Sequence, residues 1–123
     1  MSVTRPKVLL VEDSEPTRKH LVPLLKDRGF DVVAVDGAAD FIRSIARVNP
    51  DVVLMDLEMP GLDGSKLIEI ARLSGVRLCP MVLFSARPEP ELAKAARSCK
   101  AAGYICKTSD GDLLSREIRR FLP

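Results

Sequence analysis

The sequence predicts an α/β fold in three layers, a five-stranded parallel β-sheet with helices packed on both faces. Five short apolar runs lack alternating polar residues, which is typical of strands that are buried on both faces of a parallel sheet. The segments between these runs carry apolar residues at three- and four-residue spacing, which indicates amphipathic helices. Because strands and helices alternate strictly, we expect right-handed crossovers between parallel strands. The 123 residues fit a single domain, residues 1–123.

The predicted strands are short runs dominated by Val, Leu and other apolar residues. In chain order they are Lys7–Val11, Asp31–Val35, Asp51–Met55, Pro80–Phe84 and Gly103–Cys106. Five runs of this length are enough for one central sheet, and each is followed by a segment with helical periodicity.

The predicted helices are marked by apolar residues at helical spacing and by residues that favour helix starts. The apolar markers are Leu21, Leu24 and Leu25; Phe41, Ile42 and Ile45; Leu67, Ile68 and Ala71; Leu92, Ala95, Ala96 and Cys99; and Leu114, Ile118, Phe121 and Leu122. Ser14 is the expected N-cap of the first helix, and Asp110 or Asp112 is expected to cap the last. Pro23 lies inside the first helix, where the missing backbone hydrogen bond predicts a bend.

Composition and charge exclude several classes of function. The formal net charge of +2 favours no particular partner, and the chain has neither a long basic run nor any Trp, so we expect no direct binding of nucleic acid. No apolar run approaches the length that spans a membrane, and the N-terminus lacks the layout of a signal peptide. We therefore expect no membrane insertion and a cytoplasmic location. Three cysteines without a CxxC pair and a single histidine give no zinc-binding pattern.

Polar residues that are suited to chemistry follow four of the five predicted strands, whereas Asp36-Gly37 after the second strand is typical of a turn. Glu12 and Asp13 follow the first strand, Asp56 the third, Ser85 the fourth and Lys107 the fifth. In an open parallel sheet, ligands bind beyond the carboxyl ends of the strands. Three carboxylates, one hydroxyl and one ammonium group are therefore expected at one edge of the sheet, and this arrangement predicts an active site.

The residue types at this edge are suited to phosphoryl chemistry that depends on a metal ion. Closely spaced carboxylates raise one another's pKa unless a divalent cation is bound, and Mg²⁺ prefers oxygen ligands. We expect Asp13 and Asp56 to bind Mg²⁺ directly and Glu12 to hold a water molecule. Lys107 and Ser85 would contact an incoming phosphoryl group. A carboxylate in this position can act as a nucleophile and carry an aspartyl-phosphate. We expect no general base to be needed, because Asp56 is ionised at neutral pH.

Together these residues resemble the receiver domain of response regulators in two-component signalling, over essentially the whole chain. The resemblance rests on VLLVEDS with Glu12 and Asp13, on the block D-x-x-M-P-G-x-D-G that begins at Asp56, on the pair Ser85-Ala86, and on Lys107. The block is fairly specific by itself, and its combination with the acidic pair, the hydroxyl and the lysine in this order is strongly so.

The resemblance implies a flavodoxin-like fold with strand order 2-1-3-4-5 and a phosphoacceptor at Asp56. The phosphoryl group would come from a histidine kinase or a phosphotransfer protein. Mg²⁺ would be bound by Asp13, Asp56 and the backbone carbonyl of Glu58, in a loop shaped by Pro60-Gly61. A receiver domain catalyses its own phosphorylation and dephosphorylation and is not an enzyme that acts on a separate substrate.

The resemblance also implies how a signal leaves the domain. Ser85 would move toward the phosphoryl group and Tyr104 would turn inward behind it, which would remodel the face formed by the fourth helix, the fifth strand and the fifth helix. A downstream protein would bind this face. Its basic residues favour an acidic partner, although a solvated helical surface is the other interpretation of such charges. These residues are Lys94, Arg97, Lys100, Arg116, Arg119 and Arg120.

The sequence departs from the family at the residue that follows Lys107. The family usually has a proline there, with a cis peptide bond, whereas this chain has Thr108. Because a cis bond to a residue other than proline costs about 3–4 kcal/mol, we expect a trans bond and a rearranged loop. The position of Lys107 then depends on the tertiary structure. Glu58 and Arg87 flank the predicted pocket and could pair across its mouth.

Two other functions compete with the phosphorylation switch. A pseudo-receiver would use the same fold as a protein-interaction module that does not depend on phosphorylation, and the missing proline keeps this alternative open. A hydrolase of the haloacid-dehalogenase type would need an aspartate two residues after the nucleophile, where Glu58 stands, so we set it aside. The chain ends just after the last predicted helix, as in a stand-alone regulator like those of chemotaxis or in a receiver taken from a longer protein.

Overall fold

The apolar runs of the sequence pair side by side as parallel strands. The structure is a computed structural model that describes residues 5–59, 61, 63–74 and 79–123. In this part of the chain the strands form one five-stranded sheet of order β2-β1-β3-β4-β5, which confirms the predicted order. The strands are β1 Lys7–Val11, β2 Asp31–Val35, β3 Val52–Asp56, β4 Met81–Ser85 and β5 Gly103–Cys106.

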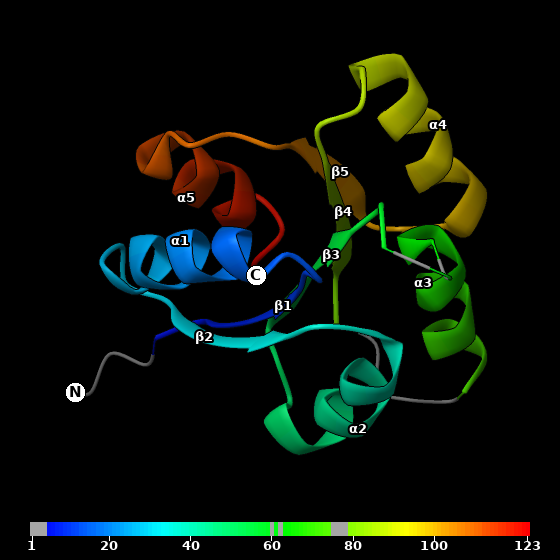
Figure 1. The fold of residues 1–123 in the computed structure, drawn as a ribbon, viewed down its shortest axis with the longest axis horizontal. Coiled ribbons are helices and arrows are strands. Elements are labelled where there is room, and N and C mark those ends of the chain that lie inside the picture. The colour runs from blue at the N-terminus through cyan, green and yellow to red at the C-terminus, as the bar shows by residue number, and fades with distance from the viewer. Residues whose placement is uncertain (1–4, 60, 62, 75–78) are drawn as a thin grey trace.

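Helices cover both faces of the sheet, so the predicted three layers are confirmed. Figure 1 shows α1 and α5 on one face and α2, α3 and α4 on the other. The helices are α1 Glu15–Lys26, α2 Ala38–Val48, α3 Gly64–Leu73, α4 Glu89–Cys99 and α5 Gly111–Arg119. In the described residues, no helix is both long enough and apolar enough to cross a membrane.

The apolar residues of each strand divide between two cores because successive side chains of a strand point to opposite faces. In β1, Leu9 and Val11 belong to the cluster under α2, α3 and α4, whereas Val8 and Leu10 belong to the cluster under α1 and α5. All four of these side chains are completely buried. The absence of polar alternation in the sequence is therefore explained by a sheet with an apolar core on each side.

The helix caps agree with the sequence. The hydroxyl of Ser14 accepts a hydrogen bond from the backbone N–H of Thr17 at 3.3 Å, as expected for the N-cap of α1. Of the two candidates for α5, Asp110 is the N-cap, and it accepts from two backbone N–H groups. α1 continues through Pro23 to Lys26, and the bend that we expect there stays a prediction.

Two strands are displaced by one residue from the prediction. β3 and β4 each begin and end one residue later than expected, so Asp56 and Ser85 are the last residues of their strands. The reason is strand pairing: Asp56 is in register with Phe84, and Ser85 is in register with Cys106. Both polar side chains are consequently held by the sheet itself and are buried, at 2% and 0% exposed.

Candidate functional site

The structure brings the three predicted carboxylates together at the carboxyl edge of the sheet. Glu12 and Asp13 directly follow β1, and Asp56 ends the neighbouring strand β3. One carboxylate oxygen from each of the three lies within 4.8 Å of the others. Glu12 and Asp56 are buried, whereas Asp13 is partly exposed and gives the cluster its access to solvent.

Lys107 reaches this cluster although Thr108 follows it. Its Nζ lies 3.0 Å from Glu12 Oε1 and 3.4 Å from Asp56 Oδ1. The backbone N–H of Lys107 donates to the carbonyl of Ser85 at 2.9 Å, which extends the pairing of β5 with β4 to this residue. The following peptide bond is trans, as expected, because the described residues contain no cis bond. The Thr108 hydroxyl accepts from the N–H of Asp110 at 3.0 Å, which shapes the turn into α5 without proline.

The pKa values of the two inner carboxyl groups are shifted in opposite directions, although burial acts to raise both. Desolvation is the largest cause that raises the pKa of Asp56, and a hydrogen bond with Glu12 adds to it, giving a value of about 7. Desolvation also acts to raise the pKa of Glu12, but the hydrogen bonds of Glu12 with Asp56 and Lys107 outweigh it and lower this pKa. Without a bound cation, much of Asp56 therefore carries a proton near neutral pH. The expectation of an ionised Asp56 is wrong for the metal-free site.

The charged form of Lys107 is stabilised by its contacts with Glu12 and Asp56. Burial acts to lower the pKa of Lys107, but its hydrogen bond with Glu12 and the charge of Asp56 outweigh this effect and raise the pKa. Lys107 is therefore positively charged at neutral pH. Among the residues that the structure describes, the Lys107 ammonium group pairs with Glu12 and Asp56, two of the three carboxyl groups, which leaves the cluster short of positive charge.

The residues present fit a divalent cation. Three carboxyl groups converge from two neighbouring strand ends. Burial and the neighbouring Glu12 raise the pKa of one of them, Asp56, and so disfavour its charged form. A hard cation that takes oxygen ligands would relieve this repulsion, and Mg²⁺ commonly binds through one or two carboxylates, with water or phosphate oxygens completing its shell. The cluster is consistent with the Mg²⁺ site that the resemblance to a receiver domain implies.

The loop after β3 brings backbone close to Asp56. The backbone N–H of Glu58 donates to Asp56 Oδ1 at 3.1 Å, and Asp63 caps α3 by accepting from the N–H groups of Ser65 and Lys66. Gly61 has a φ of +79°, which favours glycine. A Cβ on Gly64 would collide with the carbonyl oxygen of Asp56, so only glycine allows this approach. Pro60, which the prediction placed in the same loop, lies outside the described residues.

Ser85, Glu58 and Arg87 form a hydrogen-bonded group beside the carboxylates. Ser85 Oγ donates to Glu58 Oε1 at 3.1 Å, and Arg87 Nε donates to the same oxygen at 2.9 Å. The predicted pairing of Glu58 with Arg87 is confirmed. Beside this group lies a depression of about 420 Å³, whose lining includes Asp13, Glu58 and Arg87, so the acidic cluster opens to solvent here.

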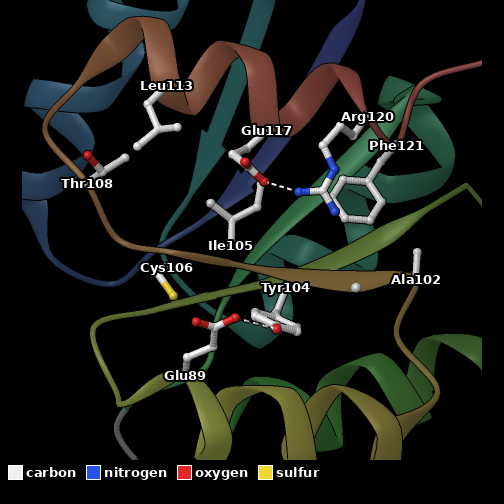
Figure 2. A pocket seen from close by; sticks show the side chains of 11 residues that line it. Glu89, Ala102, Tyr104, Ile105, Cys106, Thr108, Leu113, Glu117, Arg120 and Phe121 are labelled. Carbon is white, nitrogen blue, oxygen red and sulfur yellow. Dashed lines mark hydrogen bonds and ion pairs between the residues drawn. The ribbon is translucent and has the colours of Figure 1, made fainter.

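Tyr104 lies in a groove of about 440 Å³ between α4, β5 and α5. Its hydroxyl donates to Glu89 Oε1 at 2.8 Å, and Figure 2 shows this contact at the side of the groove next to α4. On the α5 side, Arg120 pairs with Glu117. The lining thus carries two carboxylates and one guanidinium, with apolar contacts from neighbouring side chains.

The predicted basic face needs one correction. Arg119 does not lie toward the groove, because its guanidinium donates to the carbonyl of Arg28 at 2.9 Å and stacks over the ring of Phe30 with 4.5 Å to the ring centroid. This side chain is drawn toward α1 by a backbone acceptor and an aromatic face that the sequence pattern does not place. All six basic residues of the prediction, Arg119 included, are exposed; the others are Lys94, Arg97, Lys100, Arg116 and Arg120.

Two contacts of the site have no signal in the sequence. Glu89 is the partner of Tyr104, but in the sequence it is only an acidic residue in the first turn of a helix. Arg18 of α1 donates from Nη1 to the backbone carbonyl of Glu12 at 2.7 Å and so helps to fix the backbone of the acidic pair Glu12-Asp13. Both contacts join residues of different elements, and no motif spacing predicts them.

Comparison with known protein families and curated proteins gives a consistent result. The response regulator receiver domain matches residues 8–119. The chain is 39% identical over 111 residues to protein-glutamate methylesterase/protein-glutamine glutaminase 5 of Myxococcus xanthus, covering 87% of this chain and 32% of that protein. It is 33% identical over 116 residues to the regulatory protein AtoC of Escherichia coli, covering 94% of this chain and 25% of that protein. The chain thus spans a third or less of these two relatives.

Solved structures show the same fold. Chemotaxis protein CheY4 of Vibrio cholerae superposes with a TM-score of 0.86 at 22% identity, over 97% of this chain and 100% of that one. The BeF3-activated receiver domain of Klebsiella pneumoniae RstA gives a TM-score of 0.83 at 29% identity, over 94% of this chain and 97% of that one.

Proposed function

The chain belongs to the response regulator receiver domain family of two-component signalling, and from this premise we propose that it is a switch whose phosphoacceptor is Asp56. A signalling role that depends on phosphorylation follows from the family. One observation carries the assignment to this residue: Asp56 lies at the buried edge of the sheet, where one oxygen from each carboxyl group of the acidic cluster lies within 4.8 Å of the others and Lys107 Nζ lies 3.4 Å from Asp56 Oδ1. A carboxylate that faces both a metal-binding cluster and a fixed cation is suited to accept a phosphoryl group.

In the proposed reaction, an oxygen of the Asp56 carboxylate attacks the phosphorus of the donor. The bond from phosphorus to the donor nitrogen of a phosphohistidine breaks, and its electron pair stays on the imidazole. Lys107 neutralises part of the charge on the transferred group, and Ser85 donates a hydrogen bond to it. Attack of water on the same phosphorus would return the carboxylate and release phosphate. We propose that the domain catalyses both steps on itself.

We propose that Mg²⁺ is held by Asp13, Asp56 and the backbone carbonyl of Glu58, with Glu12 contacting it through a water molecule. The ion would supply positive charge that offsets the three carboxylates and the phosphoryl oxygens. The depression lined by Asp13 and Glu58 supports this assignment, because it leads from solvent to the acidic cluster.

We further propose that the partners are a histidine kinase or a phosphotransfer protein on the input side, and a downstream protein at the face formed by α4, β5 and α5. Exposed basic residues on both helices support an acidic partner. We also propose a cytoplasmic location. The pseudo-receiver alternative has lost the observation that favoured it, because Lys107 reaches the carboxylates although Thr108 stands in place of proline.

The phosphoacceptor is tested by incubating the protein with acetyl phosphate and Mg²⁺ and measuring its intact mass. The wild type and Asp36→Asn should gain one phosphoryl group, and Asp56→Asn should gain none. Asp36 is the matched control because it is an exposed aspartate that follows β2 at the same edge of the sheet. A folded wild type that gains no phosphoryl group and binds no Mg²⁺ would contradict the proposal.

The switch role of Tyr104 has its own prediction. The hydrogen bond from its hydroxyl to the Glu89 carboxylate raises the pKa of Tyr104, so Glu89→Gln is expected to lower this pKa. The chain has one tyrosine and no tryptophan, so the absorbance band of tyrosinate and the fluorescence of tyrosine report Tyr104 alone. A pH titration of the absorbance measures the shift.

The control is Glu91→Gln, which removes the same charge from the first turn of the same helix and should leave the pKa of Tyr104 unchanged. In the wild type, phosphorylation should change the fluorescence of Tyr104 as its ring leaves Glu89. Fluorescence that stays constant while the protein gains the phosphoryl mass would contradict the proposed movement of Tyr104.

A further inference from the structure

The hydroxyl of Ser85 is already engaged in the structure described here. It donates to Glu58 Oε1 at 3.1 Å, and it accepts from the backbone N–H of Arg87 at 3.0 Å. Ser85 is completely buried, whereas the side chains of Glu58 and Arg87 are each about half exposed, at 49% and 47%. The contact therefore joins a buried switch residue to a charged pair at the surface.

Two donors share one oxygen of the Glu58 carboxylate. Besides the Ser85 hydroxyl, Arg87 Nε donates to Oε1 at 2.9 Å. The guanidinium neutralises the charge of Glu58 and fixes the direction of its side chain. Because Arg87 and Ser85 are two residues apart on the same segment, the ion pair places the Glu58 carboxylate directly at the serine hydroxyl.

A hydroxyl group has a single proton to donate. The proposed function requires Ser85 to donate that proton to an oxygen of the phosphoryl group on Asp56. The same proton cannot serve Glu58 and the phosphoryl group at once, so the two acceptors exclude each other.

We propose that Glu58 is a positioning residue whose carboxylate, held by Arg87, binds the hydroxyl of Ser85 in the resting state. The carboxylate then competes with the phosphoryl group for the hydrogen bond from this hydroxyl. This inference rests on the proposed function and adds a regulatory role for Glu58. The role belongs to the carboxylate and is separate from that of the backbone carbonyl, which we assign to Mg²⁺. On phosphorylation the Ser85 hydroxyl then donates its hydrogen bond to the phosphoryl group instead of to Glu58, while Arg87 stays paired with the Glu58 carboxylate.

The competition can be measured with beryllium fluoride, which binds a carboxylate as a mimic of the phosphoryl group and has been used to activate the RstA receiver domain. We measure the affinity of beryllium fluoride for the full chain by fluorine NMR, in the presence of excess Mg²⁺. Glu58→Gln keeps the backbone carbonyl and the length of the side chain but replaces a charged acceptor with a neutral one. We expect it to bind beryllium fluoride about tenfold more tightly than the wild type, since hydrogen bonds to charged acceptors are markedly stronger than neutral ones.

Removing the negative charge of Glu58 would also favour binding of the beryllium fluoride anion, even without any competition for Ser85. A double-mutant cycle with Ser85 separates this effect of charge from the effect of competition. In the Ser85→Ala background, Glu58→Gln should change the affinity by no more than about twofold, because no hydroxyl remains for which the acceptors compete. Glu91→Gln, an exposed position outside the site, controls for the general effect of charge. If Ser85→Ala does not fold, Ser85→Cys takes its place, since a thiol is a weak donor of similar size.

Each outcome decides between the hypotheses. A tenfold gain that appears only when Ser85 is present supports the competition. An equal gain with and without the hydroxyl, or no gain at all, overturns it while leaving the proposed phosphoacceptor in place. Failure of the folded wild type to bind beryllium fluoride with Mg²⁺ would overturn the proposed function, and the competition with it.

Discussion

Replacing Gly64 with alanine is expected to lower the free energy of unfolding by about 3 kcal/mol, because there is no room for a methyl group at this position. A Cβ on Gly64 would overlap the carbonyl oxygen of Asp56 and would lie 2.9 Å from Met55 Cγ and 3.0 Å from the carbonyl carbon of Asp56. The opposing atoms belong mainly to the backbone of β3, which is paired on both sides in the middle of the sheet. The collision cannot be relieved by rotating a side chain.

The measurement is urea denaturation of the wild type and of Gly64→Ala, with Gly37→Ala as the matched control. Gly37 is extended, and a Cβ added there would have no atom within 4 Å. Its replacement should lower the free energy of unfolding by no more than about 1 kcal/mol, because Gly37 is the N-cap residue of α2 and alanine is less favourable there than glycine. Since Gly64 contacts the phosphoacceptor strand, Gly64→Ala should also slow modification by acetyl phosphate. Equal stability of the two variants would show that α3 can shift away from Asp56 at little cost.

The second large effect concerns the stability of the metal-free protein as a function of pH. Burial and the neighbouring Glu12 raise the pKa of Asp56 to about 7, well above its ordinary value near 3.8. Between these two values the folded protein keeps a proton that the unfolded chain has released. Stability therefore falls as pH rises through this range, and above the folded pKa the protein bears the full cost of ionising Asp56.

Asp56→Asn removes this cost because the amide does not ionise. We compare the free energies of unfolding of the variant and the wild type in protein kept free of divalent metal. The difference in favour of the variant should increase by on the order of 2–4 kcal/mol as the pH rises from about 4 to about 8. Urea denaturation at both pH values in the presence of a chelator measures the difference. Added Mg²⁺ should reduce it at the higher pH, because a cation stabilises the ionised carboxylate of the wild type.

A difference between wild type and variant that does not change with pH would contradict the raised pKa of Asp56. Asp36→Asn serves again as the control, since that exposed aspartate lies outside the acidic cluster. Its stability should follow that of the wild type at both pH values. The pH effect and the phosphorylation test share one variant, so they link the electrostatics of Asp56 to its proposed chemistry.

Much of the fold was predictable because local patterns carry it. Unbroken apolar runs such as Lys7–Val11 identify buried strands, and the spacing of residues such as Leu114 and Ile118 identifies helices. Strict alternation then leaves few topologies for a parallel sheet. The strand ends depend on pairing: Asp56 and Ser85 are the last residues of their strands because pairing with the neighbouring strand extends to them.

The candidate site was predictable in its membership and in the pairing of Glu58 with Arg87, but not in its other contacts. The sequence by itself determined which side chains lie at the carboxyl edge of the sheet, because that follows from their position after each strand. Only the tertiary structure decided that Lys107 reaches Glu12, that Arg119 turns toward Phe30, and that Ser85 donates to Glu58. Lys107 and Glu12 are 95 residues apart, and their distance depends on strand register and side-chain direction. The raised pKa of Asp56 likewise arises from burial and from a neighbouring carboxyl group, which are properties of the folded chain alone.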